Sequence, residues 1–163
     1  MNRFGRSWLR LLMGFCAVWL FAGCASEARQ AKIDRRYDED DIREAVFHRL
    51  INDASSTIKP SSAAYFIAFG QRDDDPPMDF MTRFEGNLPP VYRFSRCKIT
   101  AGKGVVDRIS GETGIVFTIN EIHWINPTEV DVSTTYYESM VNSAPLNYKV
   151  KKSEQGWKVE MPR

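Results

Sequence analysis

Few residues in this chain are suited to acid–base chemistry. His48 and His123 are its two histidines. Glu121, Asp131 and Glu138 lie near His123 in the order of the expected strands, and a histidine beside a carboxylate can act as a general acid and base. That chemistry requires both side chains to converge in a pocket, whereas charged residues on strands usually face solvent. We therefore expect no catalytic residues, and we keep His123 with one of these carboxylates as the alternative.

Sequence motifs for other chemistry are also missing. The chain has no GxSxG, HExxH or CxxC motif, and the glycines around Lys103 lack the spacing of a phosphate-binding loop. The acidic runs Asp38–Asp41 and Asp73–Asp75 lack the alternating acids and the glycine of a calcium loop. A metal site with two histidines would need His48 and His123 to converge from different elements. We expect no metal, no cofactor and no enzymatic activity.

The positive charge is concentrated at the N-terminus. Arg3, Arg6 and Arg10 lie there, and no acidic residue precedes Glu27. Without the first 23 residues, 19 of the 22 basic residues remain against 21 acidic ones, a net charge of −2. A nearly neutral domain lacks the strongly basic face of a nucleic-acid-binding protein, so we expect no nucleic-acid partner.

An apolar stretch follows the three arginines. It covers residues 11–22, and twelve helical residues span about 18 Å, well short of the ~30 Å hydrocarbon core of a membrane. A basic start, a short apolar stretch and small residues after it are typical of an export signal. We therefore assign residues 1–23 to a signal peptide.

The signal ends in Leu20-Phe21-Ala22-Gly23-Cys24, which resembles the lipobox of bacterial lipoproteins. Phe21 departs from the usual aliphatic residue. The resemblance implies that the Cys24 sulfur is acylated and that Cys24 becomes the first residue of the mature protein. Ala25 stands where an aspartate would indicate retention in the inner membrane, so the resemblance implies an outer-membrane anchor facing the periplasm. An ordinary secretory peptide cleaved after Ala25 is the alternative.

This assignment leaves Cys97 without a cysteine partner. Cys16 leaves with the signal and Cys24 is consumed by acylation, while the compartment is oxidising. We expect Cys97 to be a small buried apolar residue. The alternative is an exposed reactive thiol or an intermolecular disulfide.

The mature chain is expected to be a tether, residues 24–38, followed by one domain, residues 39–163. The tether is polar and mixed in charge. The acidic run Asp38–Asp41 suits a helix N-terminus, and apolar residues then recur at three- and four-residue spacing. This pattern predicts a helix over residues 40–54. The apolar stripe consists of Ile42, Val46, Phe47, Leu50, Ile51 and Ala54.

The rest of the domain is rich in β-branched and aromatic runs separated by turn signals. Strands are predicted at 63–69, 91–100, 114–125, 129–138, 146–152 and 157–161, with a short helix at 78–85 and turns at 102–104 and 142–145. The predicted class is α+β, with the long helix packed on a curved antiparallel meander sheet.

The strand 114–125 carries bulky residues on both faces. Strict alternation places Phe117, Ile119 and Ile125 on one face with Glu121 and His123, and Val116, Ile122 and Trp124 on the other with Thr118 and Asn120. We expect this strand to be central and covered on both sides.

The whole domain, roughly residues 40–160, resembles a family of uncharacterised bacterial proteins. The resemblance is carried by Asp41–Phe47, Tyr65–Gly70, Asp75–Pro77, Phe80, Arg83-Phe84, Pro89–Val91, Ser95, Cys97, Ile122, Trp124, Tyr136–Glu138, Tyr148–Val150 and Gly156–Val159. That family has no activity to carry over. The leading helix and the closing Gly-Trp-Lys-Val strand are also similar to NTF2-like and cystatin-like folds, which include enzymes and non-enzymatic binding modules, and fold alone does not fix function.

The expected function is a lipid-anchored periplasmic domain that binds a protein partner or a small ligand without catalysis. The first alternative is a small NTF2-like enzyme using His123 and a nearby carboxylate. The second is a secreted inhibitor acting through an exposed loop, either Asn142–Pro145 or Asp73–Pro77.

Replacing Cys24 with serine tests the anchor. We expect the wild-type protein, extracted from membranes, to have a mass that places an acylated residue 24 at its N-terminus. Cys24→Ser should release the domain or stall its processing, because acyl chains contribute about 0.8 kcal/mol per buried methylene. A soluble wild-type product that starts at Ser26 would contradict the assignment.

Overall fold

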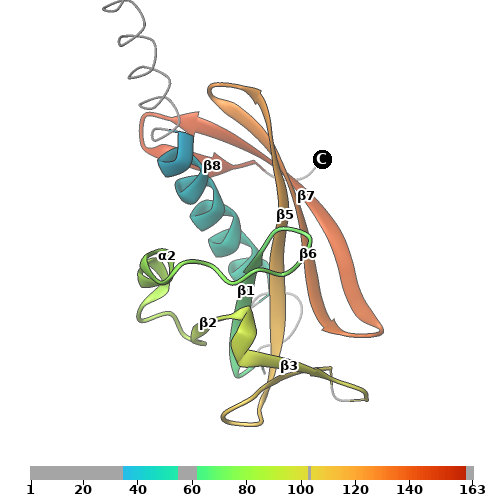
Figure 1. Cartoon of the computed structure of the whole chain (residues 1–163). Helices are drawn as coiled ribbons and strands as arrows, with labels where there is room; N and C mark the ends of the chain where they lie inside the picture. The colour runs from blue at the N-terminus through green and yellow to red at the C-terminus, as the bar shows by residue number, and fades with distance from the viewer. Residues whose placement is uncertain (1–34, 55–61, 103, 161–163) are drawn as a thin grey trace, which may run out of the picture. The chain divides into compact units, whose positions relative to one another are not determined.

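The structure is a computed structural model that describes residues 35–54, 62–102 and 104–160. The predicted signal peptide, the lipid-attachment residue Cys24 and the tether as far as residue 34 lie outside these residues. Residues Glu39–Arg163 form one compact unit, and Figure 1 labels most of its strands.

Residues 35–54 are helical. Residues 35–38 were predicted as tether, and they extend the helix because no glycine or proline interrupts it there. The predicted apolar stripe is buried, and its six residues are 0–5% exposed. On the polar face, Arg43 bridges Glu39 and Asp40 over 3.0 and 3.1 Å. This amphipathic pattern is the one that the sequence predicted.

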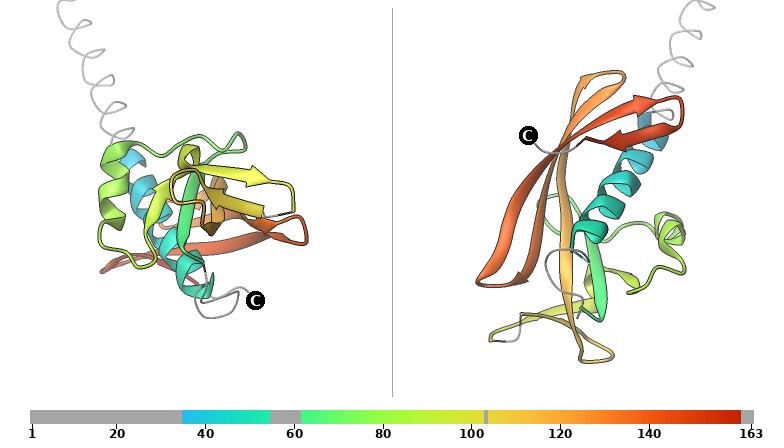
Figure 2. Two further views of the ribbon diagram at one scale, coloured as in Figure 1. Left: turned by 90° about the horizontal axis from the view of Figure 1, so that it is seen from below. Right: turned by 180° about the vertical axis from the view of Figure 1, so that it is seen from behind.

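The described strands form one curled sheet. Their bounds are β1 (Ala64–Phe69), β2 (Val91–Arg93), β3 (Cys97–Thr100), β4 (Gly104–Asp107), β5 (Thr113–Asn126), β6 (Glu129–Ser139), β7 (Asn142–Ser153) and β8 (Gly156–Val159). The main order is β2-β1-β5-β6-β7-β8, with β4 also pairing with β5 and β3 pairing with β4. The long strands β5, β6 and β7 bend along their length (Figures 1 and 2). The α+β class and the curved sheet are thereby confirmed.

The sheet is mixed, so the prediction of a fully antiparallel meander is wrong. β5 to β8 follow one another antiparallel, but β1 pairs parallel with both β2 and β5. The connection from β1 to β2 contains α2 (Met78–Met81) and the 3-10 turn η2 (Thr82–Phe84). A long connection brings the chain back to the end of the sheet where β1 begins, so β2 can run parallel to β1. A tight hairpin would make the two strands antiparallel.

Two predicted boundaries also differ. The strand predicted at 91–100 is interrupted by the 3-10 turn η3 (Phe94–Arg96), and β4 begins inside the predicted turn at 102–104. The turn predicted at Asn142–Pro145 is part of β7. Pro145 fits there because β8 pairs with β7 only at Val150–Ser153, leaving Pro145 on a sheet edge where its missing N–H is tolerated.

The sheet has apolar residues on both faces. Tyr65, Ile67, Ile115 and Phe117 belong to the same core cluster as the apolar stripe of the helix. On the opposite face a smaller cluster unites Ala64, Phe66, Cys97, Val105 and Val116. The first half of β5 is therefore buried on both faces, as predicted. The second half is exposed on one face, so the prediction that the whole strand is covered on both sides is wrong there.

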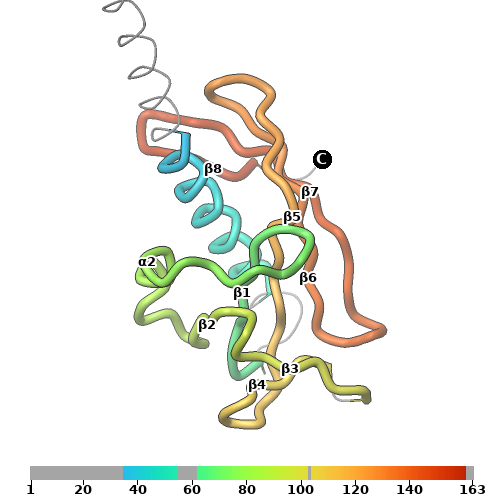
Figure 3. Tube along the Cα trace, in the orientation of Figure 1, coloured from blue at the N-terminus to red at the C-terminus, as the bar shows by residue number. Residues whose placement is uncertain are grey.

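The β3–β4 hairpin, whose path is drawn in Figure 3, contributes Cys97 and Val105 to this second cluster. Gly104 has φ +75°, and a Cβ there would collide with the carbonyl oxygen of Glu138 in β6. Glycine therefore allows the hairpin to approach β6 closely. Cys97 is 3% exposed, and burial raises the pKa of its thiol to about 11. The prediction of a small buried Cys97 is confirmed.

A buried ion pair holds η3 against the end of β4. Arg96 Nη2 lies 3.0 Å from Asp107 Oδ2, and the Asp107 side chain is 3% exposed. The hydrogen bond from Arg96 lowers the pKa of Asp107 below its ordinary value. Asp107 Oδ1 also accepts the Ile109 N–H at 2.9 Å, so one carboxylate fixes both η3 and the turn after β4.

Truncating Leu50 tests the buried face of the helix. Leu50 is 2% exposed, so Leu50→Ala should lower the free energy of unfolding by about 2–5 kcal/mol. Arg49→Ala removes a helical ion pair with Asp53 at 2.8 Å, and a pair of this kind stabilises a helix by about 0.5 kcal/mol or less. Urea unfolding of both variants measures the difference. Equal effects would mean that the buried face is misassigned.

Candidate functional site

A β-bulge in β5 decides which side chains face solvent. Ile119 pairs with Thr134 and Glu121 pairs with Ser133, so β5 has one extra residue, Asn120, at this point. Because the extra residue reverses the alternation, Ile122 and Trp124 pack against the helix-side core with Phe117 and Ile119. The prediction that Glu121 and His123 share a face with Phe117 and Ile119 is therefore wrong.

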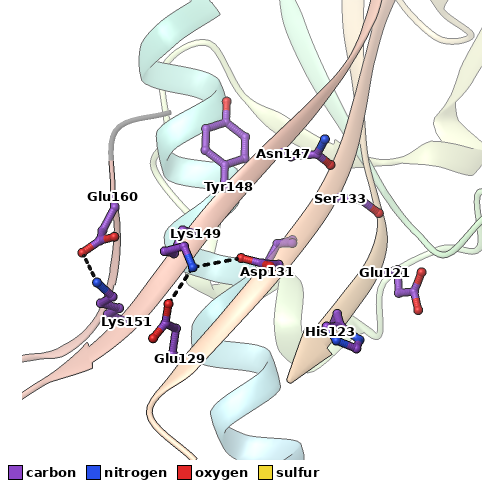
Figure 4. A pocket seen from close by; sticks show the side chains of 11 residues that line it. Glu121, His123, Glu129, Asp131, Ser133, Asn147, Tyr148, Lys149, Lys151 and Glu160 are labelled. Carbon is purple, nitrogen blue, oxygen red and sulfur yellow. Dashed lines mark hydrogen bonds and ion pairs between the residues drawn. The ribbon is translucent and has the colours of Figure 1, made fainter. Parts of the chain in front are cut away.

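The reversal places Glu121 and His123 on the exposed face of the sheet, where β5, β6 and β7 surround a hollow of about 730 Å³ (Figure 4). Charged side chains dominate its lining. The charged and titratable lining residues are Glu121, His123, Glu129, Asp131, Lys149, Lys151 and Glu160. Ser133 and Asn147 complete its polar surface, while Tyr148 turns towards the core and is 4% exposed.

Strand register aligns these residues in rows. His123 is opposite Asp131, which is opposite Lys149, and Glu129 is opposite Lys151. Side chains in such cross-strand rows lie close enough to interact. The hollow is thus a product of three strands in register, and no loop contributes to these rows.

The two lysines are engaged by acids within the hollow. Lys149 Nζ lies 2.6 Å from Glu129 Oε1 and 3.6 Å from Asp131 Oδ1. Lys151 Nζ lies 2.8 Å from Glu160 Oε1. The hydrogen bond from Lys149 lowers the pKa of Glu129, and the same bond raises the pKa of Lys149. The hollow therefore carries four carboxylates and two ammonium groups.

Of the carboxylates considered with His123, the structure brings Glu121 and Asp131 to the same hollow. Within the described residues, His123 makes no hydrogen bond or ion pair with either carboxylate, and all three side chains are exposed. Glu138 lies elsewhere and accepts a hydrogen bond from Asn142. The ring of His48 lies 5.0 Å from that of Phe84, and His48 is paired at 3.8 Å with Glu44. The two histidines therefore do not share a site.

The two segments considered for an inhibitory loop are both held by the fold. Asn142–Pro145 is paired with β6 as part of β7. In the other segment, Asp73 accepts a hydrogen bond from Thr118 at 2.8 Å, and Asp75 accepts one from the Ser95 N–H at 2.8 Å. These acids serve the fold of the loop. The predicted exposed loop at Asn142–Pro145 is wrong, because that segment is a strand.

The surroundings of His123 bear on its capacity for proton transfer. A histidine acts as a catalytic base most effectively when a hydrogen bond orients it and its pocket excludes water. In the described part of the chain no hydrogen bond orients His123, its side chain is exposed, and Asp131 contacts Lys149. Among the described residues, no group of three or more histidine, cysteine, aspartate or glutamate side chains has an arrangement that could hold a metal ion.

Sequence reasoning missed Lys149, Lys151, Glu129 and Glu160 as members of the site. Along β7 the two lysines alternate with the buried Tyr148 and Val150, so they face the opposite side of the sheet. The missing information was the register between β6 and β7, which aligns Lys149 with Asp131.

Comparisons with protein-family models, curated proteins and solved structures found no match to this chain. In the ranges that the structure describes, no helix has the length and apolar character needed to cross a membrane.

Removing Lys149 tests the electrostatics of the hollow. In Lys149→Met the pKa of Glu129 should rise towards its ordinary value, because the hydrogen bond that stabilises its ionised form is lost. A lowered pKa in the folded state stabilises the protein at neutral pH, and this contribution disappears as the pH falls through that pKa. An NMR titration of the side-chain carboxyl carbons measures the change. An unchanged Glu129 pKa would contradict the pairing, and Lys98→Met on β3 is the control.

Proposed function

We propose that this chain is a lipid-anchored protein of the bacterial periplasm whose domain is a non-enzymatic binding module. The anchor is proposed at Cys24, from the lipobox-like residues before it. The binding surface is proposed to be the charged hollow on β5, β6 and β7. Its ligand is proposed to be a protein partner with a charged, complementary surface.

The observation that carries this proposal is the pairing of charges in an open hollow. Lys149 and Lys151 are 43% and 47% exposed and remain in contact with acids. Exposed ion pairs of this kind contribute little to stability but can select a partner by charge complementarity and set the rate of encounter. The open form of the hollow suits a protein surface, which does not need to be enclosed as a small substrate does.

We further propose that the domain belongs to the NTF2-like or cystatin-like group of folds and to the family of uncharacterised bacterial proteins that its sequence resembles. In this arrangement the helix ending at residue 54 packs across the curved sheet. Support comes from the core cluster, in which Val46, Phe47 and Leu50 of the helix join Ile115 and Phe117 of β5.

The second candidate function is acid–base catalysis by His123. One observation favours it, namely the position of His123 directly opposite Asp131 in a polar hollow that also contains Glu121. Catalysis would require a ligand to displace Lys149 from Asp131 and to bring the imidazole and the carboxylate together. The two candidate functions predict different effects of His123→Gln. Catalysis predicts loss of activity with unchanged partner binding, whereas the binding module does not require His123 as an acid or base.

Affinity capture from native membranes tests the binding module. Wild-type protein and the double variant Lys149→Gln/Lys151→Gln are compared by quantitative mass spectrometry of the co-purified proteins. We expect one or a few partners to be depleted at least tenfold in the double variant, while Lys98→Gln retains them. Circular dichroism and urea unfolding establish that the variants are folded.

Retention of every partner by the folded double variant would contradict binding through the hollow. For the second candidate, His123→Gln is compared with the wild type for complementation of a deletion strain. Loss of complementation with full partner capture would favour catalysis over binding.

A further inference from the structure

A second hollow of about 380 Å³ lies against the edge strand β2, apart from the charged residues on β5 to β7. Its walls come from α2 and η2 on one side and from β2 and η3 on the other. The apolar side chains in its lining are Met78, Met81, Phe84, Val91 and Tyr92. The polar part of the lining consists of Thr82, Glu85, Arg93, Ser95 and Arg96. The volume lies within the range of small-molecule sites, in which apolar walls combine with polar groups that orient the ligand.

Arg93 lines this hollow, and few of its N–H groups donate a hydrogen bond to an oxygen atom. Its Nη2 lies 3.3 Å from Asp75 Oδ2, and its Nη1 donates to the Met78 sulfur at 3.6 Å. Its Nε is buried and has no hydrogen-bond partner. A thioether is a weak acceptor, and a buried donor without a partner is costly. Within the described residues, the Nε and Nη1 atoms of Arg93 thus lack an oxygen acceptor.

The neighbouring arginines are already committed to acids. Arg96, which also lines the hollow, is held by Asp107 at 3.0 Å, and its guanidinium lies 3.4 Å from the centre of the Tyr92 ring. Arg83 in η2 bridges Asp41 and Glu44 of the helix. A ligand anion entering this hollow would therefore find its unused donors on Arg93.

We propose that this hollow binds an aliphatic carboxylate, a medium-chain fatty acid, with its carboxylate on Arg93 and its chain along Met81, Phe84 and Val91. The carboxylate replaces the Met78 sulfur as the acceptor for Nη1. Met78 is 67% exposed, and its flexible side chain can leave this position without opening the core. Charge-assisted hydrogen bonds orient the ligand, and burial of its chain supplies most of the affinity.

Methyl-group NMR tests the site with three probes, namely decanoate below its micelle concentration, decanol below its solubility limit, and butyrate. Decanoate should shift the Met78 and Met81 methyl signals and saturate them. Decanol has the same chain length without the charge and should bind at least about tenfold more weakly, because a hydrogen bond to a charged group contributes at least that factor. Butyrate keeps the carboxylate but lacks most of the chain, and it should not saturate at the concentrations used.

Arg93→Gln should reduce decanoate affinity at least about tenfold and leave decanol affinity unchanged. Arg72→Gln, which changes an exposed arginine of the loop after β1, should bind decanoate like the wild type. Equal binding of decanoate and decanol by the wild type would overturn the proposal, and this comparison does not depend on whether a variant folds. Full decanoate affinity in folded Arg93→Gln would overturn it as well.

Discussion

The face that each side chain of β5 occupies depends on the bulge between Ile119 and Glu121. Before the bulge, Phe117 and Ile119 pack into the helix-side core; after it, Ile122 and Trp124 do so. If Asn120 occupied a regular strand position instead of a bulge, Glu121 and His123 would point into this core, where unpaired polar groups are costly. The bulge therefore keeps one continuous apolar core along β5 and creates the charged hollow on its other face.

The face of the sheet opposite the long helix is covered by other elements at one end only. The charged hollow lies on the part of this face that is not covered. At one end, the β3–β4 hairpin packs Cys97 and Val105 against Phe66 and Val116, so both faces are apolar. Further along β5 the hairpin no longer covers this face, and charged side chains take the place of apolar ones there. The second hollow lies at the opposite edge of the sheet, where the short β2 leaves room beside α2. The first hollow is charged because it is formed by aligned side chains on the faces of β5, β6 and β7. The second is more apolar because it lies between the edge strand β2 and the short elements α2 and η2.

Local patterns predicted the parts of the fold that depend on neighbours in sequence. The helical stripe from Ile42 to Ala54 and the long strands β5 and β6 follow from periodicity alone. The parallel pairing of β1 could not be predicted, because it depends on how the chain returns through α2.

The candidate site was predicted in part. His123, Glu121 and Asp131 were named from their order along the chain, but alternation placed His123 and Glu121 on the wrong face because one extra residue, Asn120, reverses it. The presence of Lys149 and Lys151 in the site follows from the register of β6 with β7. A local sequence pattern does not predict that register.

The most direct test of the account is a nuclear Overhauser spectrum of the domain, because it reports which side chains of β5 share a face. We expect contacts between the rings of Trp124 and Trp157, whose centroids lie 5.6 Å apart, and between His123 and the side chains of Asp131 or Lys149. Contacts from the His123 ring to the core residues Phe117 or Val150, with Trp124 lacking contact to Trp157, would contradict the bulge and the charged hollow built on it.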